Sequence, residues 1–225
     1  MKCRDCIYYK EIDARSGSCY GVKIKGDRDP VKGSDKCRGK FFKPRKSSAK
    51  YGRVLNMNVT LIGMAGVGKS VIGKALAKRL SFDFIDTDKI IENNLGRGLQ
   101  EIIDACGEEK FLRMEEKTIT GLKLSGGCVI ATGGSGVYSK KAMAFLKKHS
   151  VVVFLDAPIS AISSWIADKD TRGIINLKKG LNLLYNERLP LYKKYAGLKV
   201  RLYTGYDKSC IVEEIIKKCR SRGLL

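Results

Sequence analysis

The stretch GMAGVGKS, residues Gly63 to Ser70, decides how the rest of the chain is interpreted. It follows a short apolar run, precedes a segment with helical spacing of apolar residues, and matches the pattern GxxxxGK[ST]. In that context the glycines let backbone N–H groups turn inward around phosphates, and the helix N-terminus adds positive potential. The stretch therefore predicts a nucleotide-phosphate site whose residues are Gly63, Ala65, Gly66, Val67, Gly68, Lys69, Ser70 and Val71.

Around this stretch, short apolar runs alternate with longer segments of helical spacing. We expect strands over residues 59–62, 82–86, 128–132, 151–155 and 198–203. We expect helices over residues 69–80, 99–105, 108–124, 140–148, 161–167 and 210–219. Strands that alternate with helices form a parallel sheet covered on both faces, so the predicted fold class is α/β.

Two carboxylates, Asp86 and Asp88, end the second expected strand at alternate positions. Residues two apart on a strand point the same way, and ligands bind at the carboxyl edge of a parallel sheet. One carboxylate would hold Mg²⁺ through water while the other orients an acceptor hydroxyl. A second interpretation, an acidic strand end or a helix cap, stays open because Asp often caps helices.

Composition indicates a packed, basic, cytoplasmic protein. Apolar residues make up 44% of the 225 residues, and no apolar run is long enough to cross a membrane. The N-terminus is charged where a signal peptide would be apolar. The formal charge of +21 attracts polyanions and is densest over residues 1–53, with 16 basic and 6 acidic side chains. Neither a basic aromatic motif nor a recognition helix accompanies the charge, so nucleic acid is not an expected partner.

The chain divides at residues 44–55, where Pro, Ser and like charges without apolar periodicity predict a basic linker. Residues 1–43 before it form a small module, and residues 56–225 after it form the α/β domain. The module contains too few apolar residues to build a core of its own, so it needs another source of stability.

The module contains four cysteines, Cys3, Cys6, Cys19 and Cys37. In a cytoplasmic chain they favour metal ligation, with structural disulfides as the alternative. Four thiolates suit Zn²⁺, but zinc ribbons use two close CxxC pairs and this module has one. The other spacings and the flanking aromatic residues resemble small high-potential-type iron–sulfur modules. We therefore favour [4Fe–4S], keep Zn²⁺ as the alternative, and expect the module to sense, to stabilise or to recruit a protein partner.

The motifs after residue 56 resemble, in their order, the shikimate kinase family of P-loop small-molecule kinases. The phosphate-binding loop is followed by the block 86–88, the strand end 130–134, the turn 151–158, the arginine-bearing segment 168–175 and the block 187–192. The resemblance implies a five-stranded parallel sheet flanked by helices, with a mobile lid. It also implies ATP and Mg²⁺ as cofactors and phosphorylation of a hydroxyl on a small molecule.

The resemblance assigns a role to individual residues. The catalytic residues are Lys69, on the ATP phosphates, Asp88, on the acceptor hydroxyls, and Arg172, the lid arginine. Mg²⁺ lies near Ser70 and Asp86. The acceptor is bound by Asp88, Gly133, Gly134, Ser135 and Arg188, the last of which grips a carboxylate. Ordinary surface arginine is the alternative interpretation for Arg172 and Arg188. For Trp165, stacking on adenine and simple packing both stay open.

The chain departs from the family at three positions. The family pattern Phe-Arg-x-x-Glu reads Phe111 to Glu115 here, with Leu112 in place of arginine. Arg113 is turned by about 100° along a helix, so it cannot replace that arginine. Ser135 stands in place of a third glycine, and Gly173 in place of a lid proline, which should loosen the lid. We therefore expect an acceptor other than shikimate: a small polyol, sugar acid, hydroxy acid or amino-acid alcohol.

A function of another class stays open beside the kinase. The chain could be a nucleotide-dependent switch, or accessory protein, that acts on a redox enzyme or metalloenzyme through the cysteine module. Asp88, Arg172 and Arg188 count against it, because a pure switch does not need all three.

Overall fold

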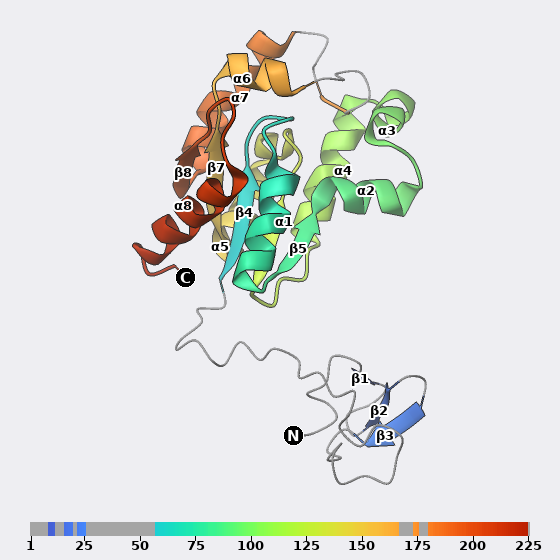
Figure 1. Ribbon diagram of the computed structural model, residues 1–225. Helices are drawn as coiled ribbons and strands as arrows, with labels where there is room; N and C mark the ends of the chain where they lie inside the picture. Colours follow the sequence, from blue (N-terminus) through green and yellow to red (C-terminus); the bar gives the residue numbers. More distant parts are fainter. Residues whose placement is uncertain are drawn as a thin grey trace. The chain divides into compact units, whose positions relative to one another are not determined.

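The computed structural model describes residues 57–166, 173–175 and 180–224, and the backbone of three short strands nearer the N-terminus. The chain divides into two compact units, Met1–Val54 and Leu55–Leu225. The second unit is the α/β domain and contains every described residue of the phosphate-binding loop and its surroundings (Figure 1).

The expected five-stranded parallel sheet is confirmed. Its strand order is β5-β6-β4-β7-β8, and all four pairings are parallel. The central strands β4 and β7 are mostly apolar and buried at every position, as a sheet covered on both faces requires. The strands are β4 (Asn58–Ile62), β5 (Asp83–Asp86), β6 (Cys128–Ala131), β7 (Ser150–Asp156) and β8 (Leu198–Arg201).

Helices cover both faces of this sheet. In Figure 1, α1 (Lys69–Leu80) and α8 (Lys208–Arg220) lie in front of it, and α5 (Lys140–His149) lies behind. Helix α1 contacts β5 and β6, while α5 contacts β7. The chain passes from β6 through α5 to β7, which lies on the other side of β4. The carboxyl end of β4 is therefore at a reversal of strand order, where α/β sheets bind ligands.

Two helices were missing from the sequence-based prediction, and both bear on the site. Helix α2 (Thr87–Leu95) begins directly after β5, and α7 (Leu181–Tyr195) contains Pro190. Proline inside a helix removes a backbone hydrogen bond and lowers the helix propensity, so the sequence around Pro190 does not predict a helix. The remaining helices among the described residues of the domain are α3 (Leu99–Cys106), α4 (Glu108–Thr120), η3 (Gly136–Tyr138) and α6 (Ile159–Trp165).

Part of the N-terminal unit is described as backbone only. Strands β1 (Tyr9–Glu11), β2 (Ser16–Cys19) and β3 (Val22–Lys25) form an antiparallel sheet in that order. Cys19 ends β2 opposite Tyr9 and Val22. The other three predicted ligands, Cys3, Cys6 and Cys37, and the predicted linker 44–55 lie outside the described residues.

Within the described ranges, no helix has the length and the apolar composition that a membrane crossing requires.

Candidate functional site

The phosphate-binding loop joins β4 to α1 and takes a shape that only glycine tolerates at three places. Gly63, Gly66 and Gly68 have φ angles of 149°, 80° and 89°. A Cβ on Gly66 would lie 2.5 Å from Ile166, and one on Gly68 would lie 2.6 Å from the Tyr206 hydroxyl. The sequence GxxxxGKS therefore specifies a loop whose backbone can approach a phosphate group closely.

Lys69 is the first residue of α1 and is buried, with 8% of its surface exposed. Its ammonium donates hydrogen bonds of 2.9 Å to the Gly63 carbonyl and 2.8 Å to the Met64 carbonyl. Burial lowers the pKa of Lys69 to about 8, although the nearby Asp88 carboxylate opposes the shift. The loop thus holds a desolvated positive charge at the N-terminus of a helix.

Ser70 and Asp86 meet at the carboxyl edge of the sheet. Ser70 Oγ donates a 2.7 Å hydrogen bond to Asp86 Oδ2, while Asp86 Oδ1 accepts from the backbone N–H groups of Asp88 and Lys89 and caps α2. The helix-cap interpretation of Asp86 is therefore correct. The expected strand alternation of Asp86 and Asp88 is wrong, because the strand ends at Asp86 and Asp88 lies in the first turn of α2. Paired hydroxyl and carboxylate oxygens are nevertheless the donors that Mg²⁺ prefers.

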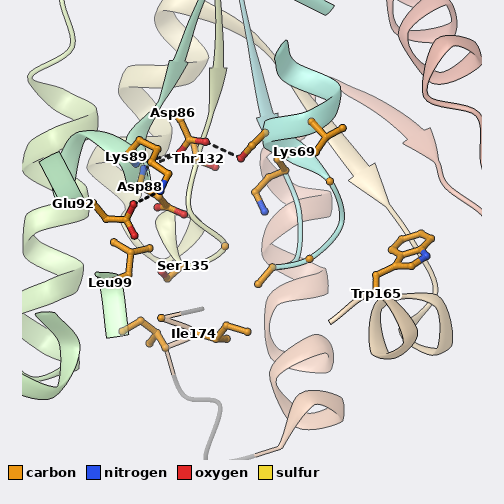
Figure 2. Close-up of a pocket in the computed structure, with 18 of the residues that line it drawn as sticks. Lys69, Asp86, Asp88, Lys89, Glu92, Leu99, Thr132, Ser135, Trp165 and Ile174 are labelled. Atoms are coloured by element: carbon orange, nitrogen blue, oxygen red, sulfur yellow. Dashed lines mark hydrogen bonds and ion pairs between the residues drawn. The ribbon is translucent and has the colours of Figure 1, made fainter. Parts of the chain in front are cut away.

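Both carboxylates face one cavity of about 540 Å³ between the loop and α2 (Figure 2). Asp88 is partly buried there, and burial raises its pKa to about 6, with Lys69 acting in the opposite direction. The same cavity is lined by Lys69, Ser70, Gly134, Ser135, Trp165 and Arg188. The fold thus brings residues from five separate sequence blocks around one space.

Gly133 and Gly134 form a floor on which three charged side chains converge. A Cβ on Gly133 would lie 2.7 Å from Asp88 Oδ1 and closer still to Glu115 Oε1. A Cβ on Gly134 would lie 3.0 Å from Arg188 Nη1. Tyr192 fixes this floor by donating a 2.7 Å hydrogen bond to the Gly134 carbonyl. A side chain at either position would displace these charged groups, and neither glycine has an unusual φ angle.

Arg188 lies in α7 and is 1% exposed, which excludes the interpretation as a surface arginine. It donates hydrogen bonds of 3.1 Å to the Tyr138 hydroxyl and 2.9 Å to the Ile175 carbonyl. Its guanidinium carbon lies 5.1 Å from the centre of the Tyr138 ring. The side chain is therefore fixed by neutral groups, and its charge is available to the cavity.

Glu115 is a site residue that sequence reasoning did not select. It lies in α4, is 2% exposed, and accepts a 2.5 Å hydrogen bond on Oε2 from the Ser135 hydroxyl. Its other oxygen, Oε1, is buried without a hydrogen-bond partner. Burial and the nearby Asp88 raise its pKa to about 8. A signal was present, because Glu115 stands between Phe111 and Ile119 on the buried stripe of α4, where a carboxylate is unexpected.

The neighbours of Glu115 on α4 bear on the predicted acceptor. Leu112 is partly buried and lines a separate cavity of about 200 Å³, which shares Ser135 with the larger one. Arg113 forms a 2.6 Å ion pair with the exposed Glu109, and both residues line the same smaller cavity as Leu112. That Arg113 does not replace an arginine at position 112 stays a prediction.

The predicted lid is described only at residues 173–175, and Arg172 lies outside the described residues. Gly173 has a φ angle of 59° and packs against Leu99. Proline, whose φ angle is fixed near −65°, could not adopt this conformation. Trp165 lines the cavity and contacts the Tyr206 ring edge-on, with centroids 5.5 Å apart. Its indole therefore packs against a neighbour and also faces the cavity.

Clusters of three or more His, Cys, Asp or Glu side chains suited to a metal ion are absent from the described residues. The side chains of the four module cysteines lie outside the described part of the chain.

Comparison with known proteins places this geometry in a family. The sequence model described as shikimate kinase matches residues 65–220. The chain belongs to the shikimate kinase family. A shikimate kinase of Vibrio vulnificus is 36% identical over 163 residues, which is 71% of this chain and 94% of the relative. Shikimate kinase 1 of Escherichia coli is 36% identical over 148 residues, which is 64% of this chain and 86% of the relative.

Solved structures agree with this family. Shikimate kinase from Acinetobacter baumannii, in complex with shikimate, has a TM-score of 0.69 and 27% identity over 75% of this chain and 96% of that one. The Aquifex aeolicus shikimate kinase has a TM-score of 0.65 and 27% identity over 75% of this chain and 99% of that one. The protein is therefore a small-molecule kinase, an enzyme that transfers a phosphoryl group to an alcohol.

Proposed function

We propose that this kinase transfers the γ-phosphoryl group of ATP to a hydroxyl of a small acceptor that is not shikimate. The observation that carries the proposal is the single cavity that joins Lys69 and Ser70 to Asp88 and Arg188. Phosphoryl transfer mainly requires positioning and charge neutralisation, and these residues supply both.

The ATP end of the cavity is built from the loop and α1. Backbone N–H groups of residues 66–70 and the Lys69 ammonium would bind the phosphates. Ser70 and Asp86 would hold Mg²⁺, which supplies neutralisation of the phosphate charge when it is bound. Trp165, which lies across the cavity from Asp88 in Figure 2, would stack on the adenine ring.

The reaction would take place beside Asp88. Its raised pKa makes it a carboxylate that can accept the proton of an acceptor hydroxyl near neutral pH. The hydroxyl oxygen forms a bond to the γ-phosphorus, the bond from that phosphorus to the β–γ bridging oxygen breaks, and ADP leaves. Lys69 would stabilise the charge that develops on the phosphoryl group, and Arg172 would add a second positive charge from the lid.

An acceptor other than shikimate is supported by the residues around Glu115, which lines the smaller cavity beside Ser135. Leu112 supplies no charge, and Arg113 is held by Glu109 at the surface. Ser135 fills the space of a third glycine and bonds to Glu115. Arg188 is therefore the one guanidinium among the described residues that lines the cavity. A charge-assisted hydrogen bond of the kind that a second arginine makes contributes about 1.5 to 3 kcal/mol.

Acceptor-dependent ADP release tests this function. Purified full-length protein would be mixed with Mg²⁺ and ATP, alone and with shikimate, polyols, sugar acids, hydroxy acids and amino-acid alcohols. We expect turnover with one class of hydroxyl compound and little with shikimate. Lys69→Met should lower kcat at least about 100-fold, since a preorganised charge is removed from the transition state. Lys78→Met, an exposed residue of the same helix, is the matched control. Efficient turnover of shikimate would contradict the altered acceptor.

For residues 1–43, we propose a metal module with Cys3, Cys6, Cys19 and Cys37 as ligands of [4Fe–4S] or of Zn²⁺, and with a protein partner. The support is the sequence: four cysteines in a basic segment with few apolar residues. Anaerobic purification followed by iron, sulfide and zinc analysis distinguishes the two metals, and the variant Cys3→Ser with Cys6→Ser should lose the metal. The proposal would be contradicted if the wild-type protein, with all four cysteines intact, were purified without bound metal. We further propose a cytoplasmic location, which suits a thiolate site.

A further inference from the structure

Two buried ionisable side chains, Glu115 and Arg188, lie near the glycine pair at residues 133–134. Arg188 lines the larger cavity and Glu115 lines the smaller one, and the two cavities share Ser135. None of the ion pairs between described residues includes Glu115 or Arg188. The Glu115 side chain is held by one neutral hydroxyl, and its Oε1 atom has no hydrogen bond. Arg188 is held by the Tyr138 hydroxyl and the Ile175 carbonyl. Burying a charge without a counter-charge is unfavourable, so both groups are suited to charges that a ligand would bring.

The two groups reach the same short segment of backbone from different helices. Glu115 Oε1 and Asp88 Oδ1 meet over Gly133, and Arg188 Nη1 lies over the adjacent Gly134. Glu115 belongs to α4 and Arg188 belongs to α7. A small ligand that lies over this floor would therefore be close to the carboxyl groups of Glu115 and Asp88 and to the guanidinium of Arg188.

We propose that the acceptor is a hydroxy amino acid, whose ammonium binds Glu115, whose carboxylate binds Arg188 and whose hydroxyl faces Asp88. The proposal rests on the proposed kinase function and names the substrate class of the same site. With no cation bound, burial and repulsion from the Asp88 carboxylate keep a proton on Glu115, as its pKa of about 8 indicates. An ammonium between them removes that repulsion and supplies the missing donor for Oε1.

The Ser135–Glu115 hydrogen bond explains why two departures from the family pattern occur together. At position 112, leucine places no cation beside Glu115, and at position 135 the serine hydroxyl fixes the orientation of the same carboxylate through Oε2. The other oxygen is then directed to Gly133, where the acceptor would lie. Ser135 is thus a positioning residue that acts through Glu115.

The test compares hydroxy amino acids with analogues that lack one charged group. ADP release by the full-length kinase would be measured with L-homoserine and L-serine. For each, the analogue without the amine (4-hydroxybutyrate, 3-hydroxypropionate) and the one without the carboxylate (3-aminopropan-1-ol, ethanolamine) would be measured beside it, with shikimate as a further acceptor. We expect one hydroxy amino acid to be used, and each loss of a charged group to lower kcat/KM about 100-fold or more, because it leaves a buried charge unpaired.

The outcomes separate this inference from the function on which it rests. Turnover of shikimate, or of a hydroxy acid without an amine, at a rate equal to that of every hydroxy amino acid would overturn the inference and leave the kinase function standing. No acceptor-dependent ADP release with any hydroxyl compound, shikimate included, would overturn the proposed function and the inference with it.

Two variants locate the effect at Glu115. Glu115→Gln keeps the size and the hydrogen bond from Ser135, so we expect it to reduce the preference for the amine-bearing acceptor to within about threefold. Its KM for ATP should not change, because Glu115 lies away from the phosphate-binding loop. Lys110→Gln, at an exposed residue of the same helix, should behave as the wild type. An unchanged amine preference in folded Glu115→Gln would overturn the proposed contact, and the wild-type panel decides the substrate class should this variant fail to fold.

Discussion

Ser70 and Asp86 are joined by a 2.7 Å hydrogen bond, and the other carboxylate oxygen of Asp86 caps the helix that carries Asp88. One side chain thus links the phosphate-binding loop to the acceptor side of the cavity. In the proposed Mg²⁺ site the charge of Asp86 would bind the metal, whereas its Oδ1 atom caps the helix, so substitutions can separate the two contributions.

Asp86→Asn should abolish most activity without lowering stability. Asparagine is as good an N-cap as aspartate, so α2 keeps its first turn, but the charge that Mg²⁺ requires is lost. Asp86→Ala should lose the same activity and also about 1 kcal/mol of stability, the usual contribution of a cap. ADP release and urea denaturation measure the two effects. Equal loss of stability in both variants would contradict the separation.

The pH profile of kcat/KM for ATP should be bell-shaped. The raised pKa of Asp88, about 6, predicts that activity rises as this carboxyl loses its proton. The lowered pKa of Lys69, about 8, predicts that activity falls when the ammonium loses its charge at higher pH. The Asp88→Asn variant should have low residual activity, and its kcat/KM should no longer rise with pH on the acidic side of the profile. A profile that stays flat between pH 5 and about 7 in the wild type would rule out Asp88 as the base.

Stability should fall with rising pH because of Glu115. The folded state raises the pKa of this carboxyl from 4.5 to about 8, so it binds the proton more tightly than the unfolded chain does. The resulting stability is fully present below about pH 4.5 and is lost as pH rises towards about 8. The free energy of unfolding of the wild type should therefore decrease between pH 5 and about pH 8, and Glu115→Gln should reduce that decrease by at least about 1.4 kcal/mol, which corresponds to one pKa unit. Denaturation at pH 5 and at about pH 8, with Glu109→Gln as the control, measures it.

Tyr192→Phe should loosen the floor of the acceptor site. The variant loses the 2.7 Å hydrogen bond to the buried Gly134 carbonyl, which should cost about 1 to 2 kcal/mol. The KM for the acceptor should rise while the KM for ATP stays constant, because the floor lies at the acceptor side. Tyr195→Phe, on the same helix, should change stability by less than about 0.5 kcal/mol. Equal changes in both KM values would indicate a general structural role.

The amino-acid sequence determined the fold class and the nucleotide end of the site. Those features depend on local patterns: apolar runs that become strands, and glycines at Gly63, Gly66 and Gly68 whose φ angles no other residue tolerates well. The ordered motifs also pointed to Asp88, Gly133, Gly134 and Arg188, because each follows or belongs to a recognisable block.

The tertiary structure alone decided how the acceptor end is charged. Glu115 and Ser135 are separated by 20 positions in the chain, yet they share a hydrogen bond because α4 contacts η3, which begins directly after Ser135. The sequence contained the buried-stripe position of Glu115, but it could not show that one oxygen lacks a partner or that Arg113 forms an ion pair with Glu109. Local periodicity fixes which face of a helix is buried, whereas the partner of a buried charge depends on segments brought together only by folding.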